Sequence, residues 1–436
     1  MKKFTIVLSL AILFASPIAV STVQAGELDV LLEKLVDKGV LSPLESQIIK
    51  DETKQLVAEE IADQRHPTLP SWVQTLKLKG DIRVRYQKDW NQSDAYAKHR
   101  GRVRMRLGLL GAVDRVNFGI GIATGGADPR STNQTFADTF DTGDLRLDYA
   151  YLQYSPKTWF LLDQIDKVDL VLGKFPRKEW LWQPTDLLWD GDINPAGFSM
   201  HAEQTTPIDN VDVFANAGIW FADERDHDRD PDGQFIKVLQ VGANWVEEVF
   251  DAKAAASMYH FNRFKGNCSP WSQGTNSGIT AVDDASCTGA LTYDYDSFGF
   301  ESQVGATQLF GGLPFGIDEY LSVFAQFIHN IDDTLTDNES GWAFGTAFGH
   351  KKVKNPGSWQ VKYIKAVLGR DAWLDALPDS DRYGGKTGVK SHEVVVSYAL
   401  RKNVILSLDY YQSNYYGSWK AHSTDHIVQG DVLIKF

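Results

Sequence analysis

Six arginines alternate with apolar residues in two neighbouring segments, 75–87 and 98–112. They are Arg83, Arg85, Arg100, Arg102, Arg104 and Arg106. Because strand side chains point to opposite faces with a period of two, each segment predicts a strand with one charged and one apolar face. An arginine stays charged at any relevant pH, so the six would form a positive wall. A half-solvated sheet of a soluble protein shows the same alternation, and the rest of the chain must decide between the two environments.

A second group of charged residues lies in the segment 173–197, which is rich in both tryptophan and acids. The acids whose charge could influence ions nearby are Glu179, Asp186, Asp190 and Asp192. The segment is too apolar for a loop that extends into water. Its tryptophans must therefore pack inside the protein, against the outer rim or against a neighbouring subunit.

The first 25 residues predict a secretory signal peptide. Lys2 and Lys3 precede an apolar run, and small residues lead to a cleavage site after Ala25. Removal of this segment changes the formal charge of the chain from −13 to −15, which argues against general nucleic-acid binding. No later segment approaches the 18 consecutive apolar residues of a transmembrane helix.

Residues 26–70 predict a short periplasmic helical extension. Leucines from Leu28 to Leu35 recur at helical spacing, and Ser42-Pro43-Leu44-Glu45 offers an N-cap, a proline at the first helical position and a capping-box glutamate. The two helices would form a hairpin that either associates with itself or the cell wall, or is only a solvated extension.

Residues 71–436 predict an all-β domain made of sixteen strands. We expect them at 75–87, 98–112, 115–125, 144–155, 167–175, 197–204, 211–222, 236–247, 250–260, 298–308, 319–329, 341–349, 358–369, 390–400, 403–412 and 426–436. Short connections alternate with long polar ones, as in transmembrane antiparallel β-barrels of the outer membrane. A barrel of sixteen strands is too wide to be filled by its own side chains, so it leaves an aqueous lumen.

The last strand and one internal tract carry a resemblance to a known family. The chain ends on an amphipathic strand with Phe436 at its terminus, which resembles the signal read by the barrel assembly machinery. Together with the tract Asp186 to Gly197, the pattern resembles the putative porin family of Gram-negative outer membranes. The resemblance implies a passive diffusion channel for small hydrophilic solutes, embedded in lipid and lipopolysaccharide, and a homotrimer by analogy.

The resemblance also implies roles for the charged residues. The apolar faces would meet lipid, so the six arginines would line the lumen, and the third long connection, 173–197, would fold inward and set the constriction. Its acids Glu179, Asp186, Asp190 and Asp192 would then face the arginine wall across a narrow opening. Because rings of arginine favour anions in pores, we expect a mild anion preference.

Two loops contain further candidate sites. Asp228, Asp230 and Asp232 have the oxygen spacing of a calcium loop, but Leu239 stands where such a loop needs a glutamate, so a solvated charge run is favoured. Cys268 and Cys287 are the only cysteines, and in an exported chain we expect them to form a disulfide within the longest loop.

Neither a cofactor nor a catalytic set is predicted. The histidines are scattered, and the sequence lacks the nucleophile, zinc and phosphate-binding motifs. The alternative to a porin is a barrel that serves as a sleeve for a secreted or electron-carrying partner protein. A partner inside the barrel would block the flux of small solutes, which separates the two hypotheses.

Overall fold

The computed structural model describes residues 38, 46, 49, 75–91, 97–136, 142–156, 165–223, 233–269, 271–279, 290–308, 319–335, 337–417 and 424–436. The predicted signal peptide, most of the predicted helical extension and the calcium candidates Asp228, Asp230 and Asp232 lie outside these residues. No helix in the described ranges is long and apolar enough to span a membrane.

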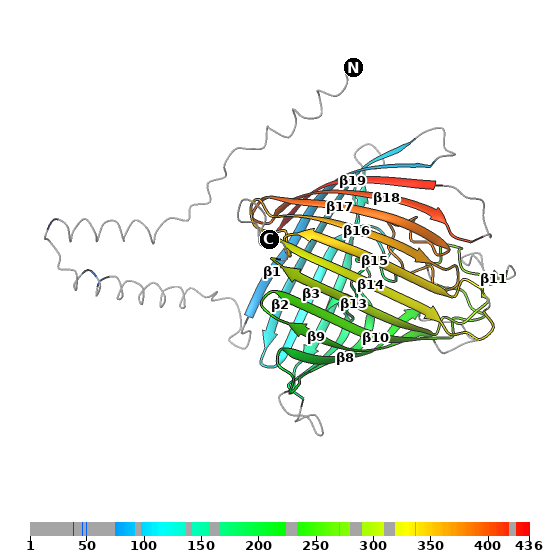
Figure 1. Cartoon of the computed structure of the whole chain (residues 1–436), viewed down its shortest axis with the longest axis horizontal. Coiled ribbons are helices and arrows are strands. Elements are labelled where there is room, and N and C mark those ends of the chain that lie inside the picture. The colour runs from blue at the N-terminus through cyan, green and yellow to red at the C-terminus, as the bar shows by residue number, and fades with distance from the viewer. Residues whose placement is uncertain are drawn as a thin grey trace, which may run out of the picture. The chain divides into compact units, whose positions relative to one another are not determined.

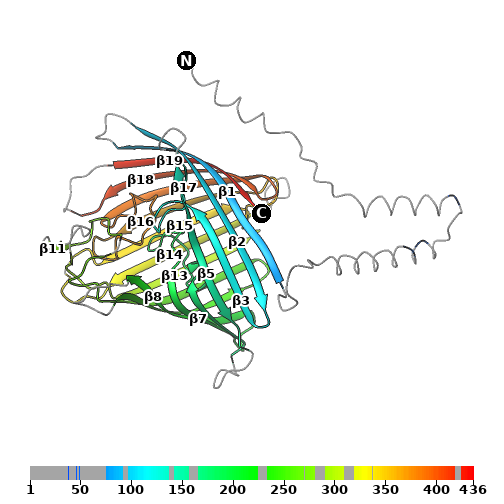
Figure 2. The same cartoon turned by 180° about the vertical axis from the view of Figure 1, so that it is seen from behind.

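Sixteen long strands of the described chain close into one antiparallel barrel (Figures 1 and 2). They are β1 (Thr75–Asn91), β2 (Lys98–Val113), β3 (Val116–Thr124), β5 (Leu145–Tyr154), β6 (Lys167–Lys174), β7 (Ala196–Thr205), β8 (Val211–Asp223), β9 (Gln234–Val246), β10 (Phe250–Asn262), β13 (Ser297–Thr307), β14 (Tyr320–Asn330), β15 (Ser340–Gly349), β16 (Trp359–Leu368), β17 (Val389–Arg401), β18 (Val404–Tyr415) and β19 (Thr424–Lys435). All sixteen predicted strands are confirmed, with ends that differ by four residues at most.

Three strands of two residues each complete the described set. β4 (Gln134–Thr135) pairs with β2 and lies in the loop between β3 and β5. β11 (Gly278–Ile279) and β12 (Ala290–Leu291) pair with each other in the loop that follows β10. These pieces order long loops and add nothing to the wall of the barrel.

The first and last strands close the barrel. β1 pairs with β19 along Asp81 to Asn91, and the backbone of Phe436 exchanges two hydrogen bonds with Gly80, at 2.9 and 3.0 Å. On β1 the apolar face is exposed, with Leu78 at 63% and Val84 at 52%, whereas Arg85 on the other face is 5% exposed. The predicted alternation is therefore confirmed, with apolar side chains outward and charged side chains toward the lumen.

Part of the lumen is occupied by a hydrophobic core. Two loops enter it: the third loop (175–195, between β6 and β7) and the seventh loop (369–388, between β16 and β17). Their buried side chains pack against inward-facing residues of the wall, including Trp220 of β8, Tyr259 of β10 and Ile364 of β16. The lumen thus has an apolar side around β8 to β16 and a charged side around β1, β2 and β17 to β19.

Candidate pore constriction

The arginines of β2 share a carboxylate from the neighbouring strand. Asp81 of β1 accepts from Arg104 at 2.8 Å and pairs with Arg106 at 2.7 Å. Residues on adjacent strands in this register face the lumen together, because Asp81 lies opposite Arg106. One carboxylate therefore compensates much of the charge of two arginines.

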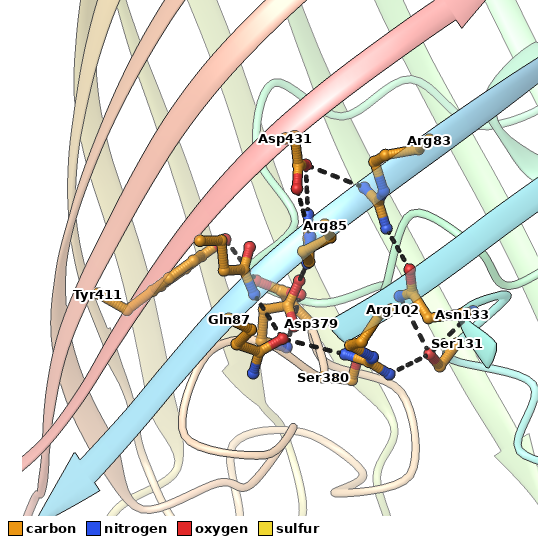
Figure 3. A network of polar contacts seen from close by, with 12 residues as sticks. Arg83, Arg85, Gln87, Arg102, Ser131, Asn133, Asp379, Ser380, Tyr411 and Asp431 are labelled. Atoms are coloured by element: carbon orange, nitrogen blue, oxygen red, sulfur yellow. Dashed lines mark hydrogen bonds and ion pairs between the residues drawn. The ribbon is translucent and has the colours of Figure 1, made fainter. Parts of the chain in front are cut away.

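Arg85 holds a second carboxylate group at the closure of the barrel. Its guanidinium binds both oxygens of Asp431 on β19, at 2.7 and 2.8 Å (Figure 3). It also donates to Asp381 of the seventh loop at 2.9 Å. Arg83 lies beside it, 3.6 Å from Asp431, and donates to Asn133 at 2.6 Å. The bidentate contact fixes the Arg85 side chain in the lumen and ties the seventh loop to the wall.

The other two predicted arginines differ from each other. Arg100 forms an ion pair with Asp89 at 2.5 Å. Arg102 donates to the Gln87 amide oxygen and to the Ser131 hydroxyl, both at 3.2 Å (Figure 3). It forms no ion pair with any described residue. The structure places all six arginines on the lumen side, but five of them lie against carboxylates.

Of the predicted acids, Asp192 alone reaches the arginines among the described contacts. It lies 3.4 Å from Arg106 and accepts from the backbone and hydroxyl of Thr132, at 3.0 and 2.8 Å. These donors, with Arg104 and Arg106 nearby, hold the pKa of Asp192 below its ordinary value despite its burial. Asp192 is therefore a fixed negative charge.

Asp190 and Asp186 bind the seventh loop instead. Asp190 accepts from the backbone of Ser380 at 2.7 Å, and burial together with the nearby Asp192 raises its pKa to about 7. Asp186 pairs with Arg382 at 2.8 Å. Glu179 is exposed and lies on the short 3-10 helix η2 (Arg177–Glu179). The predicted opposition of these acids to the arginines is thus seen at one position only.

Tryptophans of the two inner loops pack together inside the barrel. The ring of Trp189 lies 5.3 Å from Trp220 and 5.7 Å from Trp373, edge to face in both cases. The indole of Trp373 donates to the carbonyl of Leu188 at 2.7 Å. Trp180 is also buried. These contacts place the aromatic part of the third loop in the lumen core, and the alternative of packing against the outer rim does not describe it.

Two glycines set the points where the third loop leaves the wall. Gly173 and Gly197 face each other across β6 and β7 and have φ angles of 119° and 148°. A Cβ atom at either position would collide with a carbonyl of the adjacent strand, Ala150 for Gly173 and Ile219 for Gly197. Glycine permits both the backbone angle and the close approach, so the chain can turn inward here.

A buried charge cluster joins the third and seventh loops to the wall. Arg382 is 4% exposed and pairs with Asp186 and with Glu393 of β17, each at 2.8 Å. Lys362 of β16 lies 3.5 Å from the same Glu393. Nothing in the sequence pattern indicated this cluster, because its members are separated by up to 207 positions along the chain.

A cavity of about 490 Å³, lined by charged residues among others, remains between this packed region and β1, β2 and β5. Its lining includes Lys79, Arg106, Asp148, Tyr149, Lys178 and Asp192. Three of its side-chain carboxylates, those of Asp81, Asp148 and Asp192, have protein donors: Asp148, for example, accepts from Asn194 at 2.9 Å. The fourth, Glu179, is exposed and has no ion pair with a described residue. Lys79 and Lys178 are exposed and form no ion pair with a described residue, although Lys79 lies over the ring of Tyr149. The available charge in this cavity is therefore mainly positive.

No cluster of histidine, cysteine and carboxylate side chains within the described ranges could hold a metal ion. Cys268 is disulfide-bonded, and Cys287 lies outside the described residues. The predicted pairing of the two stays a prediction.

A closed barrel with an outward apolar face and loops inside its lumen defines a β-barrel protein of the outer membrane. The sequence profile of the putative porin family matches residues 14–99, 91–291 and 290–436, and the chain belongs to this family. No curated protein matches the chain. Family and fold point to a channel rather than an enzyme.

Solved porin structures match the chain at low sequence identity, and OprB shares its fold. OprB of Pseudomonas putida is 11% identical, with a TM-score of 0.51 over 83% of this chain and 94% of OprB. A mutant porin of Rh. blastica is 10% identical, with a TM-score of 0.39 over 83% of this chain and all of that chain. OmpT of Vibrio cholerae is 11% identical, with a TM-score of 0.45 over 82% and 99%.

Proposed function

We propose that the protein is a passive diffusion channel for small hydrophilic solutes, with a constriction formed by the third loop and the lumen arginines. The observation that carries the proposal is the charge-lined cavity of about 490 Å³ between the third loop and strands β1, β2 and β5. Arg106 from the wall and Asp192 from the loop both line it and contact each other as an ion pair at 3.4 Å. Charged side chains along a narrow space favour hydrophilic solutes over apolar ones.

We further propose a mild anion preference, and two lysines supply its main support. Arg83, Arg85, Arg100, Arg104 and Arg106 lie beside carboxylates, which reduces their field. Lys79 and Lys178 have no such partner among the described residues. Because cationic side chains that line a pore favour anions, these lysines and Arg102 would set the sign of selectivity.

The packed side of the lumen argues against the alternative, a sleeve for a partner protein. The third and seventh loops fill this side with large buried side chains, among them Trp189, Trp373 and Leu188. A threaded protein segment would have to displace this core. A small solute requires only the charge-lined cavity beside it.

We propose export by the 1–25 segment, insertion through recognition of the strand that ends at Phe436, and a homotrimer, since closed symmetry is the rule for homo-oligomers. The 26–70 extension would lie in the periplasm, and Cys268 would pair with Cys287. Chemical crosslinking of the purified protein in mild detergent measures the number of subunits directly.

Single-channel recording in a planar bilayer under a salt gradient tests the channel itself. Steady conductance steps with a reversal potential on the anion side are expected. A reversal potential on the cation side would still support the channel proposal, but it would assign the selectivity to Asp192 and its neighbours. An absence of conductance from correctly folded protein would overturn the porin proposal, and the sleeve would then lead.

A further inference from the structure

Three tyrosine–histidine pairs recur on the outward surface of six adjacent strands, from β16 through β19 to β1 and β2. In each pair a tyrosine hydroxyl meets the Nδ1 atom of a histidine on the neighbouring strand. The pairs are Tyr86–His99 at 2.6 Å, Tyr363–His392 at 2.8 Å and Tyr410–His426 at 2.9 Å. Tyr86 lies two positions after the exposed Val84 on β1, and residues two apart on a strand share a face. The same spacing on the other strands puts all three pairs on the lipid side.

These pairs lie beyond the apolar band, toward the end of the barrel that carries the long loops. On β16 the outward side chains run from Val361 through Tyr363 to Lys365, and the strand then enters the seventh loop. On β18 they run from Leu408 through Tyr410 to Gln412. Tyrosine concentrates where hydrocarbon meets headgroups, so the residues after it lie at headgroup level.

Lysines accompany the pairs at this level. They are Lys88 of β1, Lys365 of β16 and Lys390 of β17. Lys365 donates to His392 Nε2 at 2.8 Å, and the same ring contacts Tyr363 through Nδ1. A ring that accepts through Nε2 is neutral, so it holds the Lys365 ammonium in place without repelling it. Lys390 lies two positions before His392 on the same face of β17.

On the six strands, no carboxylate lies on the outward face between the tyrosines and the end of the barrel that carries the long loops. The acids of this part of the barrel have the opposite parity and point into the lumen: they are Asp89, Glu393, Asp409, Asp425 and Asp431. In a chain of net charge −13, an outward strip with lysines and no acids is a marked separation of charge. The charge of the strip is complementary to an anionic partner that reaches it from the lipid side.

We propose that this strip, with Lys365 and Lys390 at its centre, binds the phosphate groups of lipopolysaccharide in the outer leaflet. The acyl chains of the lipid would lie on the apolar band below, formed in part by Val361, Val396 and Leu408, while the phosphates meet the two lysines. Basic residues at this depth attract anionic headgroups, and the tyrosines lie at the level between the lipid's acyl chains and its phosphates. The proposal rests on the outer-membrane location and not on conduction.

Native mass spectrometry of the folded protein in detergent, titrated with diphosphoryl lipid A, tests the site. The double variant Lys365→Gln/Lys390→Gln should bind the lipid about tenfold more weakly or worse, since each near-surface cation contributes on the order of 1 kcal/mol. Lys237→Gln is the matched control, because Lys237 is an exposed lysine of β9 whose neighbour His260 contacts Asp296 at 2.6 Å. The control should bind as the unaltered protein does.

Further arms separate the sources of the anion. Lipid A without phosphates should bind the unaltered protein and the double variant equally weakly, and tight binding of this lipid would overturn the proposal. Displacement of lipid A by millimolar inorganic phosphate would assign the strip to free anions instead. Crosslinks from Lys390 to a second copy would assign it to subunit contact. Unchanged heat-modifiable mobility of each variant on electrophoresis shows that the barrel is folded.

Discussion

The effect of each charged side chain in the lumen depends on the partners that compensate it, more than on how many charged side chains there are. Asp81 joins two arginines of β2, and its side chain is about 10% exposed. Replacement Asp81→Asn would leave Arg104 and Arg106 with less compensation. We expect a higher anion-to-cation permeability ratio and a loss of about 3 kcal/mol in the free energy of unfolding, the cost of unpairing buried charge.

Reversal potentials and urea unfolding measure both effects of Asp81→Asn. Lys77→Gln is a control on the same face of β1, at an exposed position without an ion pair among the described residues. A permeability ratio that falls in Asp81→Asn would contradict the assignment of Asp81 as the counter-charge of these arginines.

Of the six arginines on β1 and β2, Arg102 is the one whose charge is least compensated by direct contacts. Replacement Arg102→Ser should lower the anion-to-cation ratio, because a lumen cation without an ion pair is lost. Folding should change little, by about 1 kcal/mol for the lost hydrogen bonds. Bilayer recordings under a salt gradient check the ratio, and an unchanged value would place Arg102 outside the constriction.

Asp190 makes the contact of the third and seventh loops dependent on pH. Its pKa rises from an ordinary 3.8 to about 7, first through burial and then through Asp192. The folded form therefore keeps a proton that the unfolded form releases between these values. Stability from this group is present at low pH and is lost as pH rises through 7.

Hydrogen exchange of the seventh loop should consequently be slower at pH 5 than at pH 8, after correction for the intrinsic rate. The Asp190→Asn variant should lose this difference, since an amide has no proton to release. Persistence of the full difference in that variant would assign the effect to another group.

The two inner loops act as one packed unit against the wall. Trp373 is fully buried, contacts Trp189, Tyr259 and Phe261, and donates to Leu188. Replacement Trp373→Ala should cost about 4 kcal/mol of local stability, as buried tryptophan deletions do, and should release both loops. We expect larger and noisier single-channel conductance.

Trp271→Ala provides the control for Trp373→Ala, because Trp271 belongs to the loop after β10 and is 49% exposed. It should keep the conductance of the unaltered protein. Equal behaviour of the two variants would mean that the inner loops do not limit the flow of ions.

The sequence predicted the strands far better than it predicted the partners inside the lumen. Alternation along β1 and β2 is a local signal, so the outward and inward faces could be assigned. The contacts of Arg85 with Asp431 and Asp381 depend on strand closure and on the path of a loop, neither of which a local pattern contains. The tryptophans indicated that the third loop is packed, but not that the seventh loop packs with it.

The whole molecule offers a test of its terminal strand. Phe436 is 54% exposed, so its ring adds little packing, whereas its backbone pairs with Gly80 in either case. Replacement Phe436→Ala should reduce the amount of barrel in the outer membrane of cells and leave refolding in detergent unchanged. Quantitative blotting of membrane fractions beside refolding yields measures this, and an equal loss in both would assign Phe436 a structural role.

Every long strand of this barrel pairs with its neighbours in sequence, with one exception, the pairing of β1 with β19. Hairpins can therefore form in order along the chain, because each closes only a short loop. The pairing of β1 with β19 must wait until β19 has been made, and it costs the entropy of joining two distant segments. Until then the edge of β1 that faces β19 has no pairing strand. The nascent protein therefore needs a binding partner that covers this edge on its way to the membrane.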